Sequence, residues 1–207
     1  MLSITAQQLG KKYGREWIFR RLEQRFEAGQ SYAITGPNGS GKSTLMQVLC
    51  GVLPPSEGKI DYFLDEKKLE AEGYYKQLLF VAPYIELVEE FTLRELLEFH
   101  FGFKSMIKGM DIPQAIAGMY LEKAKNKHIK FFSSGMRQRL KLGLAFYTDV
   151  PVLFLDEPTS NMDSQGIDWY LKNMEAVHQD RLVIIASNQP YEYEMCHKSI
   201  AIHTFNK

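Results

Sequence analysis

A glycine-rich segment is the feature that most constrains the fold of this chain. Residues 36–43 read GPNGSGKS, which fits the pattern G-x-x-x-x-G-K-[ST]. The short apolar segment 31–35 runs into it, and the segment 44–53 that follows has the apolar spacing of a helix. Glycines let the backbone turn its N–H groups toward phosphate oxygens, and the start of the next helix also attracts anions. This strand–loop–helix order predicts an α/β fold that binds a nucleotide through its phosphates.

Two side chains at the end of this segment have chemistry of their own. The ammonium group of Lys42 can reach the β- and γ-phosphates, and the hydroxyl of Ser43 can bind Mg²⁺. We therefore expect a Mg²⁺–nucleotide complex as the ligand. The residues expected to surround the phosphates are Gly36, Pro37, Asn38, Gly39, Ser40, Gly41, Lys42, Ser43 and Thr44.

Two adjacent carboxylates close the apolar segment 150–156. Asp156 is its last residue, and Glu157 follows directly. In a parallel α/β sheet, ligands bind beyond the carboxyl ends of the strands. We expect Asp156 to hold Mg²⁺, directly or through water, and Glu157 to act as the general base on an attacking water molecule.

The remaining apolar patterns predict a mostly parallel sheet core with an antiparallel β-lobe and a helical insertion. Alternation at 2–9 and 18–26 is typical of half-buried antiparallel strands. The continuous apolar runs at 150–156 and 181–187 are typical of buried parallel strands. The other predicted elements are strands at 59–63, 78–82 and 198–203 and helices at 93–101, 113–125 and 166–177.

The length and composition fit a single folded domain of 207 residues. We expect 1–89 and 133–207 to form the core and the β-lobe, and about 90–132 to form the helical subdomain. Lys plus Arg and Asp plus Glu both number 25, and this balance disfavours a nucleic-acid-coating protein.

The sequence also bears on where the chain works. It has no run near the roughly 18 apolar residues that span a bilayer and no signal-peptide pattern. We therefore expect neither a secreted protein nor a membrane channel. Cys50 and Cys196 lack the spacing of a metal site or redox pair, so we expect reduced thiols.

Three motifs in the chain together resemble those of an ATP-binding cassette (ABC) ATPase, the nucleotide-binding subunit of an ABC transporter. The segment 36–44 resembles the phosphate loop of that family. The segment 132–136, FSSGM, resembles the signature LSGGQ, and a basic helix follows it. The segment 155–163, LDEPTSNMD, resembles the acidic strand end and the loop after it. The resemblance covers nearly the whole chain and implies the fold of a P-loop NTPase.

The resemblance also implies roles for residues outside the phosphate loop. Tyr13 occupies the position of an aromatic residue that stacks on adenine. Two cassettes of this family close head to tail around two ATP molecules, and Asp163 would help to couple the two sites. Ser133 and Gly135 would contact the γ-phosphate of ATP bound to the opposite subunit. The signature that would face that subunit consists of Ser133, Ser134, Gly135 and Met136.

The resemblance to this family also implies which partners the chain has and where in the cell it works. A second cassette, identical or different, would complete the dimer, and a separate integral membrane subunit would carry the cargo. The chain would then be cytoplasmic and peripheral on the inner face of a membrane, with no nucleic acid bound. Some of Tyr84, Ile85, Leu87, Phe101 and Phe103 would form the interface with the membrane subunit, unless they belong to the core.

The chain departs from the family pattern at the segment after the strand at 78–82. The family usually has a glutamine there that touches the metal and the attacking water. This chain has Pro83-Tyr84 and no glutamine nearby. Glu86 and Glu89 are the closest polar candidates, and the sequence does not choose between them.

A second departure follows the strand at 181–187. The family has a histidine there, whereas this chain has Asn188. An amide can donate a hydrogen bond but carries no proton or charge at neutral pH. Because Glu157 is present, we expect a slow ATPase, completed by a partner. The alternatives are a nucleotide-gated module with little or no hydrolysis and a soluble ABC ATPase outside transport.

Overall fold

The computed structural model describes residues 1–177 and 181–205, which form two compact units. The α/β unit contains residues 1–80, 151–157 and 181–205, and the helical unit contains 81–150 and 158–177. The helical unit is larger than the insertion expected at 90–132, because it includes two long helices that follow residue 132. The organisation of 1–207 as one cassette domain stays a prediction.

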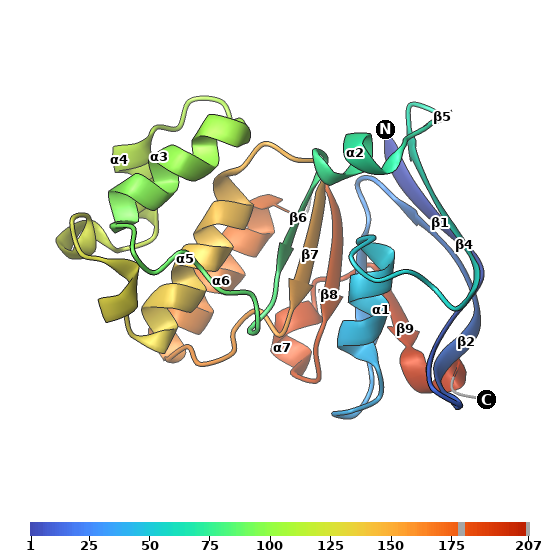
Figure 1. The fold of residues 1–207 in the computed structure, drawn as a ribbon. Helices are drawn as coiled ribbons and strands as arrows, with labels where there is room; N and C mark the ends of the chain where they lie inside the picture. Colours follow the sequence, from blue (N-terminus) through green and yellow to red (C-terminus); the bar gives the residue numbers. More distant parts are fainter. Residues whose placement is uncertain (178–180, 206–207) are drawn as a thin grey trace. The chain divides into compact units, whose positions relative to one another are not determined.

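The first sheet of the α/β unit is antiparallel, with the strand order β2-β1-β4-β5 (Figure 1). β1 (Leu2–Tyr13) pairs with β2 (Glu16–Glu27) on one side and with β4 (Glu57–Leu64) on the other. The short β5 (Lys67–Lys68) pairs with β4. Phe19, Leu22 and Phe26 of β2 are buried, and β2 and β4 both pair antiparallel with β1, so the predicted antiparallel lobe is confirmed.

The second sheet has the strand order β6-β7-β8-β3-β9. Its pairs β7–β8, β8–β3 and β3–β9 are all parallel, which confirms the parallel core. Every residue of β7 and β8 is buried, as their continuous apolar sequences require. The bounds of these strands are β6 (Leu78–Val81), β7 (Val152–Asp156), β8 (Leu182–Ala186), β3 (Ser31–Thr35) and β9 (Lys198–Ala201).

Helix α1 (Lys42–Leu49) packs between the two sheets of the α/β unit (Figure 1). It contacts β1 of the first sheet and β7 and β8 of the second. Leu45 and Val48 on α1 are fully buried, and they belong to one apolar core with residues of both sheets. The shorter helices of this unit are α2 (Ala71–Tyr75), α7 (Pro190–Tyr193) and the 3₁₀ turn η3 (Ile202–Phe205).

The helical unit contains four α-helices among the residues that the structure describes. Thr92 with Glu95, and Asp111 with Gln114, form capping boxes that fix the starts of two of them. None of the helices described is long and apolar enough to cross a membrane. The elements of this unit are α3 (Leu93–Phe103), α4 (Ile112–Gly118), η1 (Glu122–Ala124), η2 (Ile129–Phe131), α5 (Ser134–Tyr147) and α6 (Ser164–Val177).

Several predicted elements have different ends in the structure. The helix predicted at 113–125 ends at Gly118, because Tyr120 adopts a left-handed backbone with φ of 57°. The helix predicted at 44–53 begins at Lys42 and ends at Leu49, before the positive φ of Gly51. The strand predicted at 198–203 ends at Ala201 and continues into η3.

Candidate functional site

The glycine-rich segment 36–43 joins β3 to α1, as its sequence predicts. Two of its glycines are required by the geometry. Gly41 has a φ of 98°, and a side chain there would overlap Ile18 of β2. Gly36 has a φ of 152°, and an added Cβ would lie 2.7 Å from Oγ of Ser40 and 2.9 Å from Ile202. The loop therefore forms a narrow turn that only glycine permits at these positions.

Lys42 is 5% exposed, and its ammonium group points into the loop. Its Nζ donates hydrogen bonds to the carbonyl oxygens of Gly36 at 2.8 Å and Pro37 at 3.2 Å. The first turn of α1 has no side-chain cap, so its backbone N–H groups are open to an anion. The hydroxyl oxygen of Ser40 is buried and has no hydrogen-bond partner among the described residues. The loop thus gathers cationic and neutral donors in a small space.

Three parallel strands bring the acidic pair to the same sheet edge as this loop. Asp156 of β7 is in register with Ala186 of β8, which is in register with Ile34 of β3. The residues that follow these strands, including Glu157 and Gly36, therefore leave the sheet at the same edge. Asp156 is 1% exposed at the end of β7.

Glu157 has an unusual backbone for a non-glycine residue. Its φ is 44°, and its N–H donates to the carbonyl oxygen of Ala186 at 2.9 Å. Left-handed non-glycine residues cost about 1–3 kcal/mol and cluster at functional sites. The side chain of Glu157 is half-buried, whereas all residues of the strand that precedes it are buried.

Asn188 lies just after β8 and contacts the phosphate loop. Its Nδ2 donates a hydrogen bond to Oδ1 of Asn38 at 2.9 Å. His197, the nearest histidine in the sequence, cannot take its place. Nδ1 of His197 contacts the backbone N–H and hydroxyl of Ser31, at the opposite end of β3 from the loop.

Two aromatic residues lie in the β1–β2 hairpin, on the same strand pair as Ile18. Tyr13 is 52% exposed, and the ammonium of Lys11 lies 5.5 Å from its ring centre. Trp17 is half-buried, and its ring contacts both the Lys12 ammonium at 5.3 Å and the Arg20 guanidinium at 4.5 Å. Tyr13 is thus the more accessible of the two rings for stacking on a planar ligand.

The signature residues lie at the start of α5 in the helical unit. Ser133 is the N-cap of α5, and its Oγ accepts a hydrogen bond from the N–H of Met136 at 3.2 Å. The α-carbon of Gly135 faces the carbonyl oxygen of Asn161, which would lie 3.3 Å from an added Cβ. A cavity of about 440 Å³ is lined by residues that include Ser133, Ser134, Gly135, Met136, Asn161 and Asp163. The structure therefore brings Asp163 and the signature together.

Sequence reasoning missed two cations of α5 that hold this unit together. A guanidinium nitrogen of Arg139 lies 3.8 Å from Oδ1 of Asp163, which also accepts a hydrogen bond from Gly166 N–H. Nζ of Lys141 donates to the carbonyl oxygens of Ala82 and Pro83. The basic character of the segment after the signature was the only signal for these contacts in the sequence.

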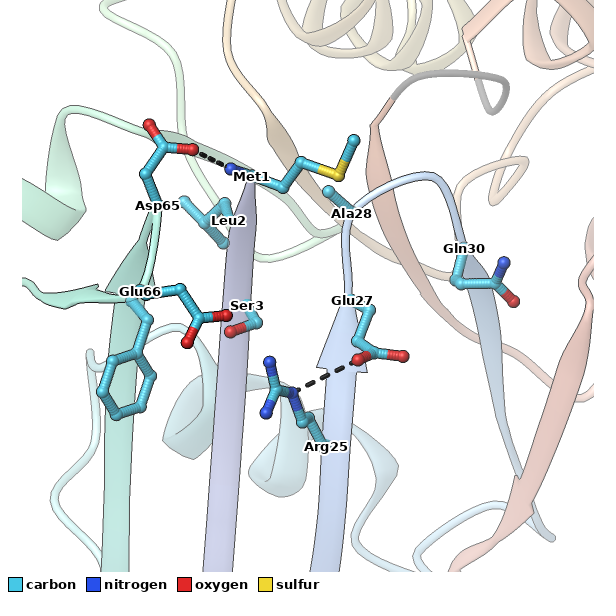
Figure 2. Close-up of a pocket in the computed structure, with 10 residues that line it drawn as sticks. Met1, Leu2, Ser3, Arg25, Glu27, Ala28, Gln30, Asp65 and Glu66 are labelled. Carbon is cyan, nitrogen blue, oxygen red and sulfur yellow. Dashed lines mark hydrogen bonds and ion pairs between the residues drawn. The ribbon is translucent and has the colours of Figure 1, made fainter.

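A separate cavity of about 660 Å³ lies at the start of β1 (Figure 2). The Met1 amino group is paired with Asp65, and Arg25 with Glu27. None of the predicted site residues lines this cavity. This cavity is therefore not part of the candidate site.

Comparison with known proteins finds a family model and curated relatives that match this chain. A family model described as "ABC transporter" matches residues 19–160. The Nod factor export ATP-binding protein I of Rhizobium johnstonii is 31% identical over 165 residues, which is 78% of this chain and 53% of that protein. The chain thus spans about half the length of this curated relative.

Solved structures with the same fold cover nearly all of the chain. The ATP-binding subunit of an ABC transporter has a TM-score of 0.82 at 23% identity, covering 98% of this chain and 86% of that one. The cassette MJ0796, solved as a post-hydrolysis dimer with ADP and Pi, has a TM-score of 0.81 at 20% identity, covering 96% and 94%. At these identities the two structures establish a shared fold.

Proposed function

This chain belongs to the ABC transporter family, and we propose that it is the ATP-binding subunit that hydrolyses Mg-ATP to power a separate membrane subunit. The observation that carries this proposal is the shared sheet edge. The phosphate loop with its buried Lys42 follows β3, and the Asp156–Glu157 pair lies at the end of β7. Both leave the sheet at that edge, with β8 between the two strands. The name of the similar Nod factor export protein favours export as the direction of transport.

The residues present fit Mg-ATP. Gly36 and Gly41 permit the tight turn of the loop, because any side chain at these positions would collide with Ser40, Ile202 or Ile18. Hydroxyl and carboxylate oxygens are the ligands that Mg²⁺ prefers, and Ser43 and Asp156 would supply them. Bound Mg²⁺ would neutralise part of the charge on the phosphates.

The chain's own groups would carry out the rest of the reaction. Lys42 would leave the carbonyl oxygens of Gly36 and Pro37 and pair with the β- and γ-phosphates. Glu157 would accept a proton from the attacking water. Asn188 would donate a hydrogen bond toward the γ-phosphate, in place of a histidine. Because an amide cannot become charged, we propose that turnover is slow until a partner completes the site.

We propose that a second cassette supplies the missing side of each ATP site. Ser133, Gly135 and Asp163 line one cavity of the helical unit, and this cluster would meet the ATP held by the opposite cassette. The N-terminus of a 14-residue helix, α5, is a suitable place for γ-phosphate oxygens. The dimeric state of MJ0796 supports this arrangement, and the second cassette is either a copy of this chain or a different one.

The membrane subunit would bind the helical unit, which would place the chain on the cytoplasmic face of a membrane. Tyr84 is 49% exposed and Phe103 is 79% exposed, so both are available to a partner. Ile85, Leu87 and Phe101 are only half-buried. Large apolar side chains left in water favour an interaction surface over a core.

ATP hydrolysis by the purified chain with Mg²⁺ tests the proposal. We expect turnover that falls at least about 100-fold in Glu157→Gln, because the general base is lost. Lys42→Ala should lose both turnover and ATP binding. Glu194→Gln and Lys108→Ala, which change exposed residues of the same types, are the matched controls.

The outcomes separate the proposed enzyme from a nucleotide-gated module. Turnover that persists in Glu157→Gln would contradict the role of Glu157. ATP binding that depends on Lys42, without turnover even in the presence of a second cassette, would favour the module. The observation that favours the module as a second candidate function is the amide of Asn188 beside the phosphate loop.

A further inference from the structure

The loop at residues 82–89 is tied to the signature helix by a lysine. Nζ of Lys141 donates hydrogen bonds to the carbonyl oxygens of Ala82 at 3.2 Å and Pro83 at 3.0 Å. These are the residues beside which the family's glutamine is expected and absent. The chain therefore lacks the expected glutamine on this loop. Instead, the ammonium of Lys141 on α5 forms hydrogen bonds with the backbone of the loop.

A second contact fastens the other end of the same loop. Nη2 of Arg137 lies 3.1 Å from Oε1 of Glu89 and donates to the carbonyl oxygen of Lys130 at 3.0 Å. Arg137 and Lys141 are four residues apart on α5, so they share one face of the helix. Of the two acidic candidates on the loop, Glu89 thus takes part in this attachment.

The surroundings of Lys141 make its hydrogen bonds hard to replace. Burial lowers the pKa of Lys141, the nearby Arg137 lowers it further, and Glu86 opposes this. A cation removed from water needs polar partners inside the protein. Ala82 is fully buried, so its carbonyl oxygen would also lose a partner if the ammonium were removed. Both sides of the contact therefore favour keeping the loop on α5.

We propose that Lys141 is a positioning residue that fastens loop 82–89 to the signature helix, so that the loop follows α5 when the ATP state changes. This step rests on the function proposed above. The loop carries Tyr84 and Val88, which are 49% and 45% exposed and are therefore accessible to a partner. Motion of the signature helix would then be transmitted to the partner through Lys141. No glutamine that contacts the metal and the attacking water would be needed.

Hydrogen exchange of the nucleotide-free chain tests the attachment. The N–H of Ile85 donates to the carbonyl oxygen of Ala82, the same oxygen that Lys141 holds. We expect amides in 82–89, Ile85 above all, to exchange at least about tenfold faster in Lys141→Met. Lys141→Arg should restore slow exchange, and Lys108→Met, a change at an exposed lysine, should have no effect. Unchanged exchange in Lys141→Met would overturn the proposal.

A second comparison tests the link to ATP. In a Glu157→Gln background, Mg-ATP should slow exchange in both 133–147 and 82–89. Adding Lys141→Met should leave the response of α5 in place and remove that of the loop, which a purely structural anchor would not do. A loop that still responds would overturn the proposal. If the parent shows no ATP response at all, the proposed function fails, and the nucleotide-free comparison still decides whether Lys141 holds the loop.

Discussion

Nδ2 of Asn188 donates a hydrogen bond to Oδ1 of Asn38 at 2.9 Å, which joins the end of β8 to the phosphate loop. Neither amide gains or loses a proton in the physiological pH range, so this contact does not change with pH. A histidine at the same place would titrate near pH 6.5. At this position the chain therefore has Asn188, a hydrogen-bond donor whose charge does not change with pH. The family pattern has a histidine there, which titrates.

Asn188→His should make ATP turnover depend on pH. We expect the ratio of variant to wild-type kcat to rise as the pH falls through about 6.5, because an imidazolium is a charged donor to the γ-phosphate. Steady-state hydrolysis across that range gives this ratio. Gln189→His, at the next exposed position, is the control and should give a constant ratio. A constant ratio for Asn188→His would place residue 188 outside the reaction.

Gly41→Ala should destabilise the chain more than Gly39→Ala. Both glycines have a positive φ, of 98° and 77°, but only an added Cβ at Gly41 meets another residue, Ile18. We expect backbone strain and overlap to lower the free energy of unfolding by about 2–4 kcal/mol at Gly41, against about 1 kcal/mol at Gly39. Denaturant unfolding measures the difference. Equal losses in the two variants would show that Ile18 does not confine the loop.

The parts of the fold that the sequence predicted are those coded by local patterns. The buried apolar runs of β7 and β8, and the glycines that turn the chain between β3 and α1, act over a few residues. The early end of α4 was not predictable, because the residue with the left-handed backbone, Tyr120, is not a glycine. Periodicity alone continues the helix past such a residue.

The site was predictable only in part for a related reason. Lys42, Asp156 and Glu157 stand in short motifs, whereas the partners of Arg139 and Lys141 come from distant segments. Nothing in the sequence pairs Lys141 with a carbonyl oxygen 59 residues earlier in the chain. Pairings of this kind depend on how helices pack, which the hydrophobic pattern does not specify to the level of one side chain.

Ser133→Asp should separate the folding role of Ser133 from its role in dimerisation. Aspartate also caps helices and complements the positive end of the helix dipole, so α5 should keep its stability. Its charge would repel the γ-phosphate of the opposite cassette. We expect thermal unfolding and ATP binding by the monomer to be unchanged, and ATP-dependent dimerisation in a Glu157→Gln background to fall at least about tenfold.

Ser133→Ala is the complementary variant. It should lower the free energy of unfolding by about 1 kcal/mol, because the N–H of Met136 loses its acceptor. Its effect on dimerisation should be weaker than that of Ser133→Asp, since no negative charge is added. Analytical ultracentrifugation with and without Mg-ATP measures the dimerisation of both variants. Normal dimerisation of Ser133→Asp would remove Ser133 from the proposed contact with ATP.

His100 should make the chain less stable in mild acid. Its Nε2 lies 2.8 Å from Oγ1 of Thr148, whose hydroxyl donates to the carbonyl oxygen of Leu144. His100 therefore donates to Thr148 in its neutral form. Burial, with the nearby Lys104 ammonium, lowers the pKa of His100 from 6.5 to about 4. The unfolded chain thus binds a proton below about pH 6.5 that the folded chain binds only near pH 4, and the free energy of unfolding falls as the pH drops between these values.

His100→Gln should remove this part of the acid sensitivity. A glutamine amide can still donate to Thr148 but does not titrate. Between about pH 7.5 and about pH 5, wild type should lose about 1 kcal/mol more stability than the variant, allowing for solvent screening of a partly exposed ring. Denaturant unfolding at the two pH values measures the difference, and the carboxylates shared by both proteins cancel in it. The same loss in both proteins would mean that His100 is protonated equally in the folded and unfolded chains.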